Sequence, residues 1–428
     1  MRDAVTVQAR AAVLQLLAYC RRKDWAGHDP YDILNGRLFQ QLPFLDARVP
    51  RLLATQAAKR SPINLRRIFG VPETQHPKAL ALFLAGYLKL SRVMDVEGGP
   101  QVVECLTERL TDLRAEHWPY YCWGYSFPWQ TRTALLPRGT PNLICTAFAA
   151  SALLDVYDVV HDAKCLRMAV SAAEYIAKEL YWEANGVAGF SYPQPGLRSN
   201  VHNANFIGAA LLARIAKSTN DDRLLGPAMR VARSSAGRQR ADGSWPYGET
   251  TSQGWIDHFH TGYNLCGLRD IARYAETAEF GRALERGFDF YRARLFRTDG
   301  VPKYFSNRSF PVDIHCVAQA IITLTALREL HPDNMRLARA VVEWALAHMW
   351  DPRGFFYYRV LRVCTIRTSY MRWSQAWMLL ALATFLEAAG DAVKGVASTV
   401  DSDAHGRRSG VSQTPVCAVQ PIGPRRLA

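Results

Sequence analysis

The sequence lacks the cysteine patterns that mark disulfide frameworks and zinc sites. Its nine cysteines are scattered through 428 residues, and no CxxC pair or Cys/His zinc spacing occurs. We interpret them as reduced, mostly buried thiols, which favours a reducing compartment. A secretory leader is not expected either, because the first apolar stretch runs into Arg21, Arg22 and Lys23 without a small-residue cleavage site. These absences predict a cytoplasmic protein.

Several other signals are missing. No apolar run approaches the roughly 18 residues that a membrane span needs, so we expect no transmembrane segment. No Walker loop, Rossmann glycine fingerprint, GxSxG elbow or HExxH motif occurs, and we therefore expect no cofactor. Metal-binding histidines usually stand one helical turn apart. Because the histidines of interest lie more than 50 residues apart, we predict no metal site, with zinc or manganese as the alternative if a closed ring brings them together.

The chain carries a net charge of +14, from 52 Lys and Arg against 38 Asp and Glu. Its basic residues are spread along the chain rather than gathered in one arm, which argues against nucleic acid as a partner. A solvated basic surface explains the excess simply. An acidic substrate, or peripheral attraction to an anionic membrane surface, remains open as an alternative.

A turn followed by an aromatic residue recurs through the chain. The glycines of these turns are Gly124, Gly186, Gly243, Gly300 and Gly354, which are separated by 62, 57, 57 and 54 residues. A constant period of this length indicates a repeat architecture in which each repeat is one supersecondary unit.

Each turn precedes a helix that is apolar almost all round, as expected of a helix enclosed on every side. We predict five such inner helices after the turns, at Thr140–Tyr157, His202–Lys217, His260–Tyr274, His315–Leu330 and Arg372–Glu387, and a sixth upstream at Ala79–Leu90. Amphipathic helices lie between them. Six helical hairpins form an open solenoid or a closed ring, and the apolar inner helices favour closure. The predicted fold is therefore an all-α (α/α)6 toroid over residues 61–390, with an N-terminal helical extension (1–60) and a disordered tail (391–428).

In such a ring all inner helices start at the same end, so their first residues converge on one mouth. His202, His260, His315 and Arg372 begin four of these helices and are separated by 58, 55 and 57 residues. We expect their side chains to meet there. Carboxylates near the imidazoles, as in Asp257-x-x-His260 and Asp313-x-His315, fit proton transfer. The catalytic candidates are His260, Asp257, His202, Tyr263, Glu249, His315 and Asp313.

Aromatic and polar residues gather in two loops at this predicted mouth. The segment from residue 241 to 264 is the denser one. The loop from residue 123 to 132 is the equivalent loop two repeats earlier. Aromatic ring faces stack on pyranose C–H groups while polar groups hold the hydroxyls, so the combination suits a sugar. The candidates for substrate binding are Trp123, Tyr125, Gln130, Arg132, Asn203, Trp245, Tyr247, Trp255, His258, Arg372 and Trp373.

The sequence resembles proteins with the α/α toroid, the scaffold of six-hairpin glycosidases, polysaccharide lyases, sugar 2-epimerases, glucuronyl C5-epimerase C-terminal domains and terpenoid cyclases. The segments WGYSFPWQTRTALLPRGTPN and DGSWPYGETTSQGWIDHFHTGYN look like uncharacterised toroid proteins associated with bacterial exopolysaccharide synthesis. That likeness implies a role in making or modifying a surface polysaccharide. The stretch from Gln239 to Trp245 also matches the Gln-x3-Gly-x-Trp repeat of triterpene cyclases, but their Asp-x-Asp-Asp proton donor is missing.

Three functions remain open at this point. The leading hypothesis is epimerisation or β-elimination at C5 of a uronate-containing or otherwise acidic glycan, which needs a base and a group that neutralises the carboxylate. A glycoside hydrolase needs two facing carboxylates, for which Glu249, Asp257 and Asp313 are the candidates. A glycan-binding or assembly subunit without catalysis is the third, because a fold does not fix a function.

Overall fold

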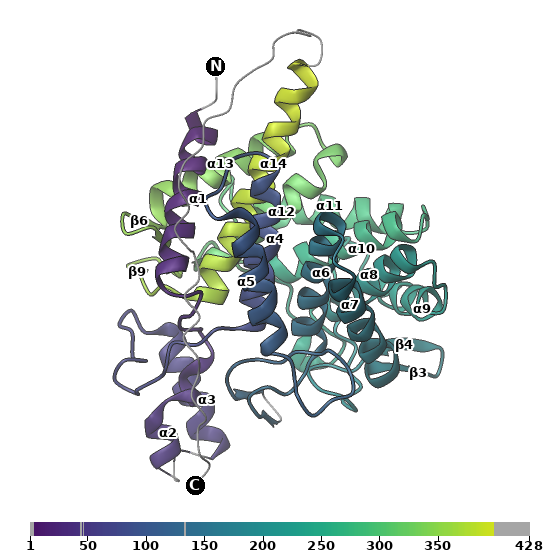
Figure 1. The fold of residues 1–428 in the computed structure, drawn as a ribbon, viewed down its shortest axis with the longest axis horizontal. Coiled ribbons are helices and arrows are strands. Elements are labelled where there is room, and N and C mark those ends of the chain that lie inside the picture. The colour runs from purple at the N-terminus through teal and green to yellow at the C-terminus, as the bar shows by residue number, and fades with distance from the viewer. Residues whose placement is uncertain (1–3, 43–44, 46, 132–133, 398–428) are drawn as a thin grey trace.

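Long helices make up most of the structure (Figure 1), and their contacts arrange them in an inner and an outer layer. The computed structural model describes residues 4–42, 45, 47–131 and 134–397. The inner helices are α4 (Pro77–Ser91), α6 (Leu143–Val160), α8 (His202–Thr219), α10 (His258–Tyr274), α12 (Ile314–Ala326) and α14 (Trp377–Ala397). The outer helices are α1 (Ala4–Arg22), α5 (Gly99–Asp112), α7 (Ala163–Tyr175), α9 (Leu225–Ala236), α11 (Gly281–Arg294) and α13 (Asn334–His348).

The inner layer is a closed ring. Each inner helix packs on the next in chain order, and α14 packs back on α4. Each is backed by an outer helix, since α5, α7, α9, α11 and α13 cover α4, α6, α8, α10 and α12, and α1 covers α14. Burial of the inner helices on all sides explains their almost uniformly apolar sequences. The predicted (α/α)6 toroid is confirmed, and closure rather than an open solenoid is the outcome.

The two ends of the described chain complete the ring together. Helix α1 lies beside α13 and α14, so the start of the predicted N-terminal extension serves as the sixth outer helix (Figure 1). The short helices α2 (Arg37–Gln41) and α3 (Arg48–Arg60) follow it, near the end of the ring where the inner helices start. The boundary at residue 60 stays a prediction. Most of the predicted tail, residues 391–428, lies outside the described residues, although α14 itself continues to Ala397.

The glycine turns connect the layers as the repeat predicts. Gly186, Gly243, Gly300 and Gly354 all have positive φ, the conformation that glycine adopts at least cost. In the triterpene-cyclase-like stretch, the amide of Gln239 donates to the carbonyls of Gly243 and Ala283 at 2.9 and 2.8 Å. This motif therefore ties a turn to the outer layer.

Strands are short and confined to these connections. Antiparallel pairs form between β1 (Trp129–Gln130) and β2 (Leu135–Leu136), β3 (Tyr181–Ala184) and β4 (Val187–Phe190), and β6 (Trp350–Asp351) and β7 (Phe355–Phe356). A three-stranded sheet has the order β5 (Val312–Asp313), β8 (Arg359–Val360), β9 (Thr365–Ile366). One-turn π-helical segments, Ile176–Leu180 and Met371–Ala376, lead into β3 and α14.

The expectation that no apolar run approaches the length of a membrane span is corrected for one helix among the described residues. Helix α6 is 18 residues long with a mean hydropathy of 1.7, which by length and composition suffices to cross a membrane. In the structure 61% of it is buried, because α4 and α8 flank it and α7 backs it. Its apolarity is accounted for by its place in the inner ring.

Candidate active site

The residues just after the N-caps of the inner helices build the candidate site. Side chains of Asp257 and Asp313 cap α10 and α12, and the imidazole of His76 caps α4. Counting from the caps, Lys78, Phe259 and His315 occupy the same second position of their helices. Arg372 is likewise the second residue of the segment that leads into α14. Equivalent positions of a closed ring point the same way, which brings these side chains toward the ring axis.

Asp257 and His260 form an acid–imidazole pair. The Asp257 carboxylate accepts from the backbone N–H of His260 at 3.0 Å, and its other oxygen lies 2.7 Å from Nδ1 of the same residue. The indole of Trp255 also donates to this carboxylate, at 3.2 Å. The His260 side chain is 21% exposed, so its Nε2 is open to a ligand. A carboxylate on Nδ1 holds the tautomer in which Nε2 accepts a proton.

An aromatic platform lies beside this pair. The rings of Tyr247 and Trp255 stack with centroids 4.6 Å apart and planes 11° apart. The Tyr247 ring also lies 4.6 Å from the His260 imidazole. Both rings are only partly buried. The arrangement matches the expected combination of a flat apolar surface and a polar group beside it.

A second imidazole, that of His315, lies deeper. Its Nε2 is 2.5 Å from the hydroxyl of Tyr263, while Phe259 stacks on its ring at 4.6 Å. The side chain is 2% exposed, and burial, with the charges of Lys78 and Arg372, holds its pKa well below the usual 6.5. His315 is therefore a neutral imidazole near neutral pH. Tyr263 lies near both imidazoles, with its ring 6.0 Å from that of His260 and 5.9 Å from that of His315.

Lys78 faces the same aromatic group. Its Nζ lies 4.1, 5.0 and 5.5 Å from the ring centroids of Phe148, Trp377 and Tyr263. The residue is 4% exposed, and burial together with the charge of Arg372 lowers its pKa from 10.5 to about 7. No carboxylate of the described residues lies within ion-pair distance of it.

The predicted pairing of Asp313 with the His315 imidazole was wrong. Asp313 accepts only the backbone N–H of His315, as an N-cap does. Its carboxylate instead receives Nε of Arg359 at 2.5 Å and the indole of Trp373 at 2.9 Å. The cause is the β5–β8 pairing, which sets Asp313 directly opposite Arg359.

Arg372 is also engaged. Its guanidinium binds the carboxylate of Asp29 through two hydrogen bonds of 2.6 and 2.8 Å, and both residues are buried. The expectation that Arg372 holds a substrate carboxylate through a forked contact is corrected for its Nε and Nη2, because Asp29 already occupies both of these donors. Asp29 comes from the segment after α1, whose contribution the sequence did not reveal. A neighbouring ion pair, Arg66 with Asp32, fixes the same segment.

His202 and His258 do not join the other imidazoles. His202 lies 3.3 Å from the hydroxyl of Ser235 on α9, and His258 lies 3.3 Å from the hydroxyl of Tyr291 on α11. Burial lowers the pKa of His202 to about 4 and that of His258 to about 3. Both are the first residues after their caps, where the side chain turns to the outer layer. The expected equivalence of His202 with His260 was wrong.

Three residues expected to bind substrate are structural instead. The fully buried indoles of Trp123 and Trp245 donate to the carbonyls of Leu110 and Ser235, at 2.7 and 3.0 Å. Gln130 is buried and holds Arg51 at 2.8 Å. These contacts fix the loops against the ring and leave no surface for a ligand.

The remaining candidate residues differ in their contacts. Tyr125 contacts Arg372, because the guanidinium carbon of Arg372 lies over the Tyr125 ring at 5.5 Å from its centroid. Asn203 is buried in the second position of α8, and its Oδ1 makes no hydrogen bond to the described residues. Glu249 forms an ion pair with Arg238 at 2.9 Å. Arg132 lies outside the described residues.

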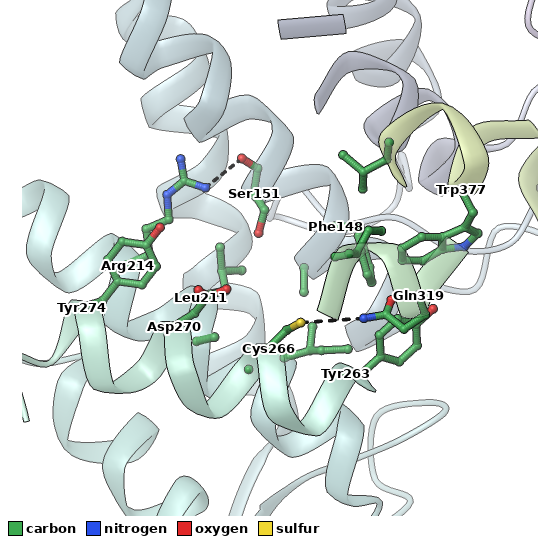
Figure 2. Close-up of a pocket in the computed structure, with 16 residues that line it drawn as sticks. Phe148, Ser151, Leu211, Arg214, Tyr263, Cys266, Asp270, Tyr274, Gln319 and Trp377 are labelled. Carbon is green, nitrogen blue, oxygen red and sulfur yellow. Dashed lines mark hydrogen bonds between the residues drawn. The ribbon is translucent and has the colours of Figure 1, made fainter. Parts of the chain in front are cut away.

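A cavity of about 230 Å³ continues along the ring axis beyond the aromatic group (Figure 2). Phe148, Tyr263 and Trp377 line it at one side, and Arg214, Asp270 and Tyr274 line it at the other. Most of its wall is apolar and comes from inner helices. The rings that contact Lys78 thus separate the mouth, with its imidazoles, from a cavity inside the ring.

Sequence reasoning missed Lys78, Asp29 and Arg359. Lys78 could have been found by counting residues from the helix caps, since it shares the second position with His315. Asp29 and Arg359 carried no such signal. They lie in irregular segments, and their roles depend on long-range pairing with Arg372 and Asp313.

No protein-family model matches the sequence, and no curated protein matches it. Solved structures do. An unsaturated glucuronyl hydrolase specific for heparin has a TM-score of 0.61 at 12% identity, over 90% of this chain and 97% of that one. A cellobiose 2-epimerase from Bacillus thermoamylovorans has 0.57 at 13%, over 72% and 87%. An α-mannanase from Bacteroides thetaiotaomicron has 0.56 at 11%, over 76% and 88%. These likenesses show the toroid fold.

Proposed function

We propose that this protein is a carbohydrate-active enzyme that moves a proton at a sugar carbon next to a carboxylate, by epimerisation or β-elimination at C5 of a uronate unit. The observation that carries the proposal is the Asp257–His260 pair, with 2.7 Å between carboxylate and Nδ1 and an imidazole open to a ligand. Such an imidazole is suited to act as a general base. The neighbours named as an epimerase and a glucuronyl hydrolase support sugar chemistry on this fold.

The reaction can be written on these groups. Nε2 of His260 takes the C5 proton, and the electron pair moves into the carboxylate to give an enolate. In epimerisation the Tyr263 hydroxyl, on its hydrogen bond to His315, returns a proton to the opposite face of C5. In elimination the electron pair instead expels the oxygen at C4, which takes the proton of the Tyr263 hydroxyl and leaves as an alcohol, and a C4–C5 double bond remains. The Tyr247–Trp255 stack supports the sugar ring beside His260.

The geometry gives less support to a glycoside hydrolase. That reaction needs one carboxylic acid and one carboxylate facing the same bond. Asp257 is bound to His260 and Trp255, Asp313 to Arg359 and Trp373, and Glu249 to Arg238. Each candidate carboxylate is thus committed to a partner of its own.

Proton exchange tests the proposal directly. The protein is incubated in D2O with a panel of uronate oligosaccharides, and the C5 position is followed by NMR and by mass, with ultraviolet absorbance for unsaturated products. We expect deuterium at C5 or an unsaturated uronate. His260→Gln should slow the reaction by about 10²- to 10⁴-fold.

Asp257→Asn provides the sharper variant. Asparagine keeps the helix cap but cannot hold the Nδ1–H tautomer as a carboxylate does. Activity should fall while the fold is retained, as read from circular dichroism. If the wild-type protein yields neither exchange nor elimination across the panel, the enzymatic proposal is abandoned. Sugar binding that depends on Tyr247 would then favour a glycan-binding protein.

A cytoplasmic location stays a prediction.

A further inference from the structure

Among the described residues, the buried charged groups at the mouth are matched in pairs, with one exception. Arg372 pairs with Asp29, Arg359 with Asp313, and Arg66 with Asp32. The fourth carboxylate, Asp257, pairs with His260. Lys78 is the buried cation left without a carboxylate partner among the described residues, and its Nζ lies over the rings of Phe148, Tyr263 and Trp377.

An unpaired buried cation is costly. Removing an ammonium from water carries a penalty of several kcal/mol, which contact with ring faces offsets only in part. A Lys78 without an anion therefore either gives up its proton or receives a charge from outside the chain. The Tyr263 ring is 5.5 Å from Nζ of Lys78, and its hydroxyl contacts His315. An anion that reached Lys78 would therefore also reach the proposed reaction centre.

The rim of the mouth carries a second lysine over aromatic rings, Lys59, which is partly exposed and donates to the hydroxyl of Tyr31. Nζ of Lys59, on α3, lies 4.3 Å from the ring centroid of Tyr31 and 5.9 Å from that of Trp373. The Trp373 ring is in turn 4.5 Å from that of His315. A row of aromatic side chains thus runs between two lysines, one at the rim and one at depth.

We infer that Lys78 is the binding site for the substrate carboxylate, so that the mouth selects acidic over neutral sugars. The proposed function supplies the identity of the anion, a uronate, and the binding itself does not depend on any turnover. The ammonium pairs with the carboxylate next to C5, within the aromatic group that holds it, and so stabilises the enolate charge. Arg372, which first suggested this role, instead holds the segment around Asp29.

Binding experiments can test this assignment. Uronate oligosaccharides and their carboxyl-reduced counterparts, which differ only in the charged group, are titrated by calorimetry into the wild type, Lys78→Met and Lys89→Met. Lys89 is the matched control, because it lies on the same helix but pairs with Glu387. Methionine fits the apolar cage around residue 78 without a charge.

The wild type and Lys89→Met should prefer the acidic form by about tenfold to a hundredfold, the usual worth of a charge-assisted hydrogen bond. Lys78→Met should lose the preference and keep its affinity for the reduced form. Equal affinity of the wild type for both forms, no binding of any uronate, or a preference that survives in Lys78→Met would each overturn the inference. Lys78-dependent binding of glucose 6-phosphate without uronate binding would also overturn it, in favour of a phosphate.

The two proposals fail in different ways. If uronates bind through Lys78 but their C5 hydrogen never exchanges, the proposed reaction is wrong and the binding site stands. If exchange occurs and Lys78→Met retains the acidic preference, the reaction stands and the site is wrong.

Discussion

Replacement of Lys78 by methionine should raise the stability of the ligand-free protein, and the gain should depend on pH. The Lys78 pKa is lowered from 10.5 to about 7 by burial and by Arg372. Between these two pH values the unfolded chain binds more protons than the folded one, so wild-type stability increases with pH. The penalty is complete below about pH 7 and disappears as pH rises through the unfolded value.

The magnitude follows from the difference between the two pKa values. Multiplied by about 1.4 kcal/mol per pH unit, the step from 10.5 to about 7 corresponds to about 5 kcal/mol at about pH 6. By the same relation about 2 kcal/mol remains at about pH 9. The Lys78→Met advantage should therefore shrink by about 3 kcal/mol between these conditions.

Equilibrium unfolding in urea, followed by tryptophan fluorescence, measures the effect at both pH values. The Lys89→Met control should show no such gain, because Lys89 is partly exposed and bound to Glu387. A Lys78→Met effect of equal size at both pH values would refute the reasoning, since a desolvated charge must titrate. Saturating uronate should narrow the gap by pairing the wild-type ammonium.

Three further substitutions test other parts of the description. Asp29→Ala should cost about 3–5 kcal/mol, seen as a large loss of melting temperature, because it leaves Arg372 buried and unpaired; an unchanged melting temperature would contradict the ion pair. Gly243→Ala should destabilise by more than about 1 kcal/mol, since φ is +88° and the new Cβ would meet the Arg286 carbonyl at 2.2 Å; urea unfolding checks it. Glu249→Gln should change stability by less than about 1 kcal/mol and leave C5 exchange intact, and a loss of exchange would restore this carboxylate as a catalytic candidate.

The position of each histidine shows where prediction from the sequence failed. A helix turns by about 100° per residue, so an error of one or two positions reverses the face that a side chain occupies. His202 and His260 were aligned by their spacing of 58 residues, yet the first follows its cap directly and the second stands two positions later. His202 consequently faces α9, whereas His260 lies at the mouth. Register relative to the cap, and not spacing, determines the direction.

The Asp257–His260 pair could be predicted because both residues lie in one helical turn. An N-cap carboxylate naturally reaches the third residue of its helix. Asp313 is also an N-cap, but His315 is only the second residue of its helix, and an antiparallel strand pair brings Arg359 against the Asp313 carboxylate. The difference of one position and this long-range contact separate the two cases.

By itself, the sequence determined the ring. A glycine turn every 54 to 62 residues sets the repeat. The inner helices are apolar on all sides, and they can bury this surface only by packing side by side until the first helix meets the last. Only the tertiary structure decided which charges at the mouth are neutralised, because Asp29, Arg359 and their partners are 343 and 46 residues apart and meet through loops that carry no periodic signal. Pairing of charges over such distances depends on where every helix finally lies, and it is this pairing that leaves Lys78 without a carboxylate.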